Sequence, residues 1–223
     1  MVKIGAITIG QAPRNDVTVD ILPILGDNIE LIQAGGLDGL THEEIAAFAP
    51  DEHDYVLVSK LVDGTSVKFA ERFILPRLQK CIDVLEKEGV SLILFLCTGD
   101  FPNVLKSHVP LIFPYKIIKT IVPVLSTRSK IAVLTPDAMQ VKQSEKKWKN
   151  YVSEVISIPA SPYANPKELD AAAERLKDLD VDLIVMDCIG YTEKMKQDLR
   201  ARTQKNIILS RTIVARLIKE LLD

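Results

Sequence analysis

The chain has 223 residues with 28 basic and 30 acidic side chains, so its formal net charge is -2. Hydrophobic residues make up 47% and charged residues 26%, the mixture of an ordinary globular protein. Binding to nucleic acid or to a membrane surface relies on clustered positive charge, so the even charge balance argues against both partners. The basic run from Lys142 to Lys149 is best explained as the solvated face of a helix.

The sequence shows no apolar run of the roughly 18 residues needed to span a bilayer. Its N-terminal segment is typical of a first β-strand and lacks the cleavage site of a signal peptide. The three cysteines form no Cys-x-x-Cys pair and no disulfide framework, and no histidine pair has the spacing of metal ligands. We therefore expect a cytoplasmic protein without a bound metal ion.

Apolar strands alternate with helices along nearly the whole chain. Continuous apolar runs such as LILFLC and DLIVMDC are typical of strands covered on both faces, as in a parallel sheet. Pro76 and Pro166 are expected in first helical turns, where a missing N–H does no harm. The pattern predicts an α/β fold with right-handed βαβ units in doubly wound sheets. Strands are expected at 3–9, 29–33, 92–97, 130–135, 152–158, 182–188 and 206–209, and helices at 14–25, 42–47, 76–87, 115–122, 140–150, 166–179, 193–203 and 211–222.

One segment interrupts this alternation. The apolar runs YVLVSKL and SVKFA flank VDGT, a pattern typical of a β-hairpin that turns at Asp63-Gly64. We expect this antiparallel pair to be an insertion in the first half of the chain.

The two halves of the sequence resemble each other. KIGAIT at residues 3–8 is similar to KIAVLT at 130–135, and LILFLCTG at 92–99 is similar to LIVMDCIG at 183–190. The same order in both halves predicts a duplicated lobe, with residues 1–112 as the first lobe and 113–204 as the second. The final strand and helix, residues 205–223, could belong to the second lobe or return to the first.

Four chemically useful side chains stand at predicted strand ends: Thr8, Cys97, Thr135 and Cys188. Ligands of parallel α/β sheets bind beyond the carboxyl ends of the strands, so these residues point to a cleft between the lobes. One thiolate could remove a proton from a carbon atom and a thiol on the other side could return one. The alternative is that both cysteines are small core residues, which is the role we assign to Cys81 on an apolar helix face.

Glycine-containing segments follow both cysteines and offer backbone N–H groups to an anion such as a carboxylate. Asp187 ends an apolar strand, where a carboxylate needs a partner. The first strand-to-helix turn adds Arg14, whose charge opposes the helix dipole; either an anion binds beside it or Asp16 offsets it. The candidate substrate-binding residues are Thr8, Gly10, Gln11, Arg14, Thr98, Gly99, Asp100, Thr135, Gly190, Tyr191 and Thr192.

The opening VKIGAITIGQAPRNDV, the hairpin YVLVSKLVDGTSV, the LCTG segment and MDCIGYT together resemble the AroM family along essentially the whole chain. That family is bacterial and its genes are associated with aromatic amino-acid metabolism in some bacteria. More distantly, the chain is similar to the aspartate/glutamate racemase superfamily, whose members have two α/β lobes and one cysteine from each. Where the racemases have Cys-Asn-Thr and Gly-Cys-Thr, this chain has Cys97-Thr98-Gly99 and Asp187-Cys188-Ile189.

The resemblance implies a racemase or isomerase that needs no cofactor and acts on a small carboxylate or amino-acid-like ligand, with Cys97 and Cys188 as its acid–base pair. Two alternatives stay open: a non-catalytic sensor or accessory binder, and a decarboxylase-type lyase that works with a single cysteine. The sequence leaves the oligomeric state open, a homodimer included.

Overall fold

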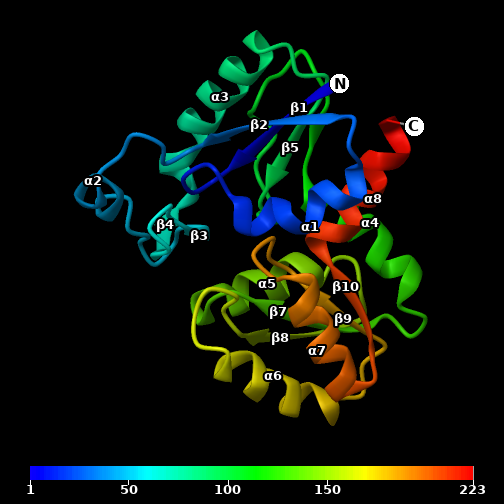
Figure 1. The fold of residues 1–223 in the computed structure, drawn as a ribbon. Coiled ribbons are helices and arrows are strands. Elements are labelled where there is room, and N and C mark those ends of the chain that lie inside the picture. Colours follow the sequence, from blue (N-terminus) through cyan, green and yellow to red (C-terminus); the bar gives the residue numbers. More distant parts are fainter. Residues whose placement is uncertain (223) are drawn as a thin grey trace. The chain divides into compact units, whose positions relative to one another are not determined.

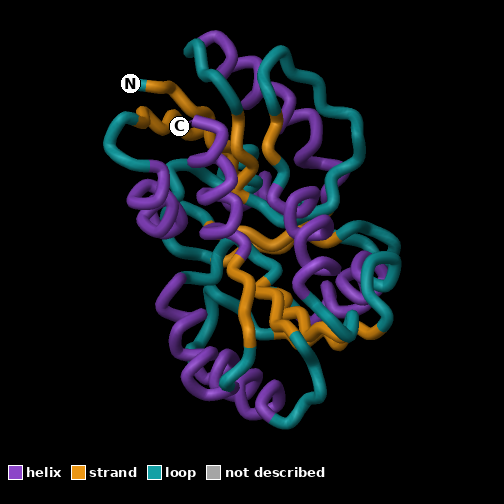
Figure 2. Tube along the Cα trace, turned by 90° about the vertical axis from the view of Figure 1, so that its right-hand side faces the viewer, coloured by secondary structure: helices purple, strands orange, loops and turns teal. Residues whose placement is uncertain are grey.

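The computed structural model describes residues 1–222, which form two compact units, Met1–Pro114 and a second that begins at Tyr115 (Figure 1). Each unit has its own sheet and its own hydrophobic core. Strands alternate with helices along most of the chain. Figure 2 distinguishes the helices, strands and loops of both units by colour.

The first unit is built around β1 (Val2–Thr8). It lies between β2 (Ile29–Gly35) and β5 (Ile93–Leu96), and β6 (Leu111–Ile112) extends the sheet beyond β5, all in parallel. The connection from β1 to β2 moves the chain toward one edge of the sheet. The connection from β2 to β5 crosses back over β1 toward the other edge. Because such crossovers are right-handed, α1 (Asn15–Leu25) and α3 (Glu71–Lys87) cover opposite faces.

The second unit repeats this plan. Its central strand β7 (Lys130–Thr135) lies between β8 (Glu154–Pro159) and β9 (Leu183–Met186), and β10 (Asn206–Leu209) pairs with β9. One face carries α6 (Lys167–Lys177) and α7 (Glu193–Thr203). The opposite face is packed by α4 (Pro114–Leu125), α5 (Val141–Trp148) and α8 (Ser210–Leu222), with the short 3-10 turn η1 (Ala138–Gln140) before α5.

Both parallel sheets therefore place their strands in the same spatial order: second, first, third and fourth, when the parallel strands of each unit are numbered along the chain. The register agrees as well, because Thr8 pairs with Leu96 in the first sheet and Leu134 with Met186 in the second. Each cysteine is consequently one residue beyond the position that lies opposite the threonine at the end of the neighbouring central strand. The predicted α/β fold with two similar parallel-sheet lobes is confirmed.

The inserted hairpin is also confirmed. After α2 (His42–Ala46), β3 (Val56–Lys60) and β4 (Ser66–Ala70) pair in antiparallel register, with Val56 opposite Ala70. Gly64 in the connecting turn has φ +91°, a conformation that favours glycine.

One helix start was predicted wrongly. Pro76 lies inside α3 and not in its first turn, because β4 passes directly into the helix and Ala70 is both the last strand residue and the N-cap. The apolar residues of the helix before Pro76 look like a continuation of the hairpin strand in sequence alone. Pro166 occupies the N-cap position of α6.

The basic run at the end of α5 is only partly solvated. Lys142, Lys146 and Lys149 are exposed, but the Lys147 side chain is only 7% exposed and its Nζ lies 2.6 Å from an oxygen of buried Asp187. The Trp148 indole N–H donates to the same carboxylate at 3.0 Å. One oxygen of this carboxylate, Oδ2, thus has two partners from α5, and these contacts tie α5 to the segment after β9.

We expect Asp187→Ala to lower the free energy of unfolding by about 3–5 kcal/mol, because it leaves a buried ammonium group without its counter-charge. Chemical denaturation followed by circular dichroism measures the change. Asp180→Ala is the matched control: its carboxylate is 71% exposed and pairs with Arg128 at the surface, so its loss costs at most about 1 kcal/mol. Equal losses in the two variants would contradict the buried network.

Candidate active site

The first candidate catalytic group lies in the Cys97 turn, residues 97–100, which follows β5. Cys97 is buried, and the backbone N–H of Gly99 donates to its sulfur at 3.3 Å. A side chain on Gly99 would meet Leu57 at 3.0 Å, so an apolar residue of the hairpin packs against this turn. The Asp100 N–H donates to the Tyr55 hydroxyl at 3.1 Å, which fixes the far end of the turn.

The second group lies in the Cys188 turn, residues 188–192, which follows β9. The same local bond recurs: the N–H of Gly190 donates to the Cys188 sulfur at 3.4 Å. In both turns the cysteine sulfur therefore accepts the backbone N–H of the glycine two residues later. The Tyr163 hydroxyl lies 3.8 Å from the Cys188 sulfur. Tyr163 is not among the site residues that the sequence predicted.

Arg211 organises the Cys188 turn from behind. This fully buried side chain, at the start of α8, donates from Nε to the Ile189 carbonyl and from Nη2 to the Gly190 carbonyl, both at 2.9 Å. Holding the carbonyl oxygens on one side fixes the orientation of the peptides in the turn. The sequence analysis missed Arg211 and Tyr163, although each follows a strand end, the signal that singled out Arg14.

The remaining residues of the Cys188 turn are held by the fold. Tyr191 is fully buried and its hydroxyl donates to the Ala160 carbonyl; burial raises the pKa of this phenol well above its usual value, and the neighbouring Cys188 adds to the effect. Thr192 is the N-cap of α7, where its side chain accepts from the Met195 N–H at 3.1 Å.

The β1–α1 turn is held against the hairpin. The Thr8 hydroxyl accepts from the Gly10 N–H at 3.2 Å. Gly10 has no room for a side chain, because a Cβ there would meet the Ser59 hydroxyl and lie 2.6 Å from the Lys60 carbonyl. Gln11 then accepts from the Val62 N–H at 3.1 Å, which joins the turn to the residues after β3.

Arg14 is 2% exposed and lies at the N-cap of α1. Its guanidinium forms a two-pronged pair with Asp16, with Nε and Nη2 at 2.8 and 2.9 Å from the carboxylate oxygens. Nη1 also lies 3.4 Å from the Ser59 hydroxyl. The offset by Asp16 that the sequence suggested is therefore present, between a buried guanidinium and a carboxylate that is 39% exposed.

Thr135 occupies the place in the second unit that Thr8 has in the first. It is buried, but its hydroxyl donates forward to the Asp137 carbonyl at 3.3 Å. Asp137 in turn caps η1 through the Met139 N–H. The two threonines are thus equivalent in the fold and differ in their hydrogen bonds.

A carboxyl pair stands near the Cys97 turn, and the sequence analysis missed one member of it. Glu71, the first residue of α3, is half-buried, and no hydrogen-bond partner is found within residues 1–222 for its Oε1 atom. Burial and, to a smaller extent, the negative charge of Asp100 together raise the pKa of Glu71 to about 7. Glu71 is therefore a group that changes charge near neutral pH close to the predicted site.

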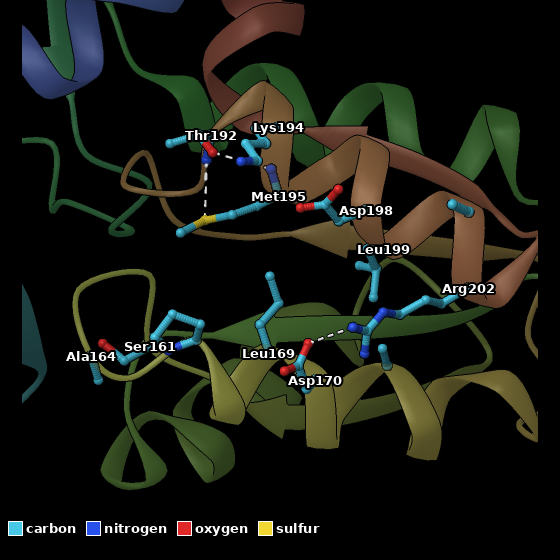
Figure 3. A pocket seen from close by; sticks show the side chains of 13 residues that line it. Ser161, Ala164, Leu169, Asp170, Thr192, Lys194, Met195, Asp198, Leu199 and Arg202 are labelled. Atoms are coloured by element: carbon cyan, nitrogen blue, oxygen red, sulfur yellow. Dashed lines mark hydrogen bonds and ion pairs between the residues drawn. The ribbon is translucent and has the colours of Figure 1, made fainter.

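The second unit also contains a groove of about 660 Å³ between α6 and α7 (Figure 3). Figure 3 shows the Asp170–Arg202 ion pair bridging the two helices, at 2.8 Å. Of the predicted site residues in the described chain, Thr192 alone lines the groove. The lining residues are Ser161, Ala164, Pro166, Leu169, Asp170, Ala173, Thr192, Lys194, Met195, Asp198, Leu199, Ala201 and Arg202.

Residues 1–222 include no group of three or more His, Cys, Asp or Glu side chains placed to hold a metal ion. No helix in that range is both long and apolar enough to cross a membrane.

The fold is shared with solved structures of racemases and an isomerase. An allantoin racemase from Klebsiella pneumoniae matches with a TM-score of 0.68 at 14% identity, over 100% of this chain and 88% of the other. The maleate isomerase Iso from Pseudomonas putida S16 matches with 0.65 at 14% identity, over 100% and 93%. The aspartate racemase of Picrophilus torridus matches with 0.62 at 12% identity, over 99% and 94%.

The family follows from the sequence itself. The model of the AroM protein family matches residues 4–222, and the chain belongs to that family. A comparison with curated protein sequences finds no significant match.

The three thiols should differ in reactivity. Burial raises the pKa of the Cys81 thiol to about 11, with a further contribution from Asp38, whereas Cys97 and Cys188 each accept a backbone N–H. We expect iodoacetamide at pH 8 to label Cys97 or Cys188 well before Cys81, because the thiolate is the reacting form. Peptide mass spectrometry over time measures the order, and Cys81 labelling first in the native protein would reverse the assignment of core and site.

Glu71→Gln should make the protein more stable at pH 8 but not at pH 4. Between pH 4.5 and about 7, the folded protein holds the Glu71 proton more tightly than the unfolded chain, so the free energy of unfolding falls as pH rises. The amide removes this loss; for a partly solvated group we expect a gain of about 1–2 kcal/mol at pH 8.

Glu44→Gln is the control of opposite sign. Hydrogen bonds from Thr41 lower the pKa of Glu44, so the charged form stabilises the folded protein above its usual pKa. Its amide variant should lose stability at pH 8 relative to pH 3. A Glu71→Gln variant that gains nothing between pH 4 and pH 8 would show that Glu71 titrates normally.

Proposed function

We propose that the protein is a cofactor-independent racemase or isomerase that uses Cys97 and Cys188 as an acid–base pair on a small carboxylate. One observation carries the proposal. In each unit the cysteine lies one residue beyond the threonine of the central strand, and its sulfur accepts the N–H of the glycine two residues later.

The chemistry requires one thiolate and one thiol. The thiolate takes a proton from the carbon next to the carboxylate and becomes a thiol, and the electron pair moves into the carboxylate as an enediolate. The second thiol returns a proton to the opposite face of that carbon and becomes a thiolate. The charges have exchanged, the atoms balance, and no redox partner is needed. Reacting groups must come within about 3–3.5 Å of the carbon, so the proposal places both turns on one substrate.

Backbone N–H groups near Gly10, Thr98 and Gly190 would hold the carboxylate and the developing enediolate. Thr8, Gln11 and Thr135 would shape the ends of the central strands around it, with Gly99 and Asp100 completing the Cys97 turn. Arg14 would supply positive charge beside the first turn, moderated by Asp16. The substrate class is a small chiral carboxylic acid with an acidic α-hydrogen, and cysteines that are not joined in disulfide bonds suit a reducing cytoplasm.

The fold neighbours support an enzyme and leave room for two alternatives. A sensor or accessory binder would keep the turns and bind a carboxylate without chemistry. A decarboxylase-type lyase would protonate its product with one cysteine only.

In heavy water the protein should introduce deuterium at the α-carbon of its substrate, because each proton is exchanged with solvent at the sulfur. Cys97→Ala and Cys188→Ala should each abolish racemisation, a loss of at least 10²–10⁴-fold, while exchange on one enantiomer persists. Proton NMR and chiral chromatography of a panel of small carboxylic acids measure both, with reducing agent present because oxidised thiols mimic an inactive protein.

Cys81→Ala is the matched control and should retain full activity, since that thiol lies on the buried face of α3 and not at a strand end. A short bifunctional thiol reagent should also link Cys97 to Cys188 in the Cys81→Ala protein. If a carboxylate binds equally well to the wild type and to both alanine variants and shows no hydrogen exchange, the protein is a binder and not an enzyme. Decarboxylation lost in only one of the two variants would identify the lyase.

A further inference from the structure

The two cysteine turns share a backbone plan but differ in what packs against them. The space above Gly99 in the Cys97 turn is filled by a Leu57 methyl group, 3.0 Å from an added Cβ. The space above Gly190 in the Cys188 turn is filled by the Tyr163 ring, whose Cζ and Cε1 would lie 2.5 and 2.6 Å from such a Cβ. One turn therefore has an apolar neighbour where the other has a phenol.

The phenol reaches the sulfur. Tyr163 Oη lies 3.8 Å from Cys188 Sγ, within the range of hydrogen bonds to sulfur, and the Gly190 N–H donates to the same atom at 3.4 Å. Glycine at position 190 is what allows this approach, because any larger residue would displace the ring.

The segment that carries Tyr163 is fixed at several points. The Ala160 N–H donates to the Thr135 carbonyl at 2.8 Å, and the Tyr163 N–H donates to the Ser161 hydroxyl at 3.2 Å. The Ser161 N–H donates to Glu168 of α6 at 2.9 Å. The ring is thus held over the Cys188 turn by the loop after β8, while Arg211 holds the turn from the other side.

We propose that Tyr163 is an additional catalytic residue: its hydroxyl donates to the Cys188 sulfur and keeps it a thiolate, so that Cys188 is the resting base and Cys97 the resting acid. The roles of Cys188 as base and Cys97 as acid rest on the proposed function. The thiolate then has two donors, the phenol and the Gly190 amide, with the Arg211 guanidinium bound to the adjoining carbonyls. Two further titratable groups lie in or beside this turn: Tyr191, which keeps its proton, and Asp187, which is paired with Lys147.

The test is the pH midpoint of Cys188 alkylation by iodoacetamide, read peptide by peptide, with Cys97 in the same sample as internal reference. Tyr163→Phe keeps the ring and removes the donor, so the Cys188 midpoint should rise by about one pH unit, a roughly tenfold loss of thiolate below the midpoint. The midpoint is read rather than one rate, because a more basic thiolate is also more nucleophilic. Gly190→Ala, which displaces the ring, should raise the midpoint in the same direction.

Tyr191→Phe is the matched control: it removes a hydroxyl from the same turn, but that hydroxyl donates to the Ala160 carbonyl, so the Cys188 midpoint should stay in place. An unchanged midpoint in Tyr163→Phe, or an equal shift in Tyr191→Phe, would overturn the proposal. Thermal melting confirms that each variant is folded. Because alkylation needs no substrate, a shifted midpoint in a protein without exchange activity would sustain the role of Tyr163 and refute the enzyme. Exchange activity together with an unshifted midpoint would support the enzyme and refute the role of Tyr163.

Discussion

Parallel strands need crossovers that return the chain to the opposite end of the sheet, so every strand of a sheet opens into its following turn at the same edge. This constraint places Thr8 beside the Cys97 turn and Thr135 beside the Cys188 turn, although 89 and 53 positions separate each pair along the chain. Repeating one strand order in both units then repeats the geometry. The candidate chemistry depends on that edge, because residues from three or four strands can reach it together.

Within this frame, the two turns are alike in backbone and unlike in surroundings. The glycine N–H to sulfur bond recurs, but the neighbours differ: Leu57, Tyr55 and the Glu71–Asp100 carboxyl pair for Cys97, and Tyr163 and Arg211 for Cys188. A reaction that moves a proton from one thiol to the other benefits from such a difference. Equivalent environments would give the two thiols the same affinity for the proton and leave the resting state undefined.

Sequence could predict the residues on strands and their ends because both signals are local. Apolar runs and a repeated KIxxxT pattern identify β1 and β7, and LCTG and DCIG identify the ends of β5 and β9. The hairpin follows from Asp63-Gly64 between two apolar runs. The start of α3 could not be predicted in this way, because Ala70 passes from strand to helix without turn residues and Pro76 resembles a first-turn proline.

The sequence by itself determined the α/β class, the duplication, the family and the two cysteines, because strand patterns and their terminal residues are written in consecutive positions. Only the tertiary structure decided which side chains meet those cysteines. Tyr163 and Arg211 come from segments 25 and 23 residues away from Cys188, and Glu71 stands near Asp100 because α3 packs on the same sheet. Such contacts depend on how helices and loops pack against a sheet, and the same packing decides whether a charged side chain such as Lys147 is buried or solvated.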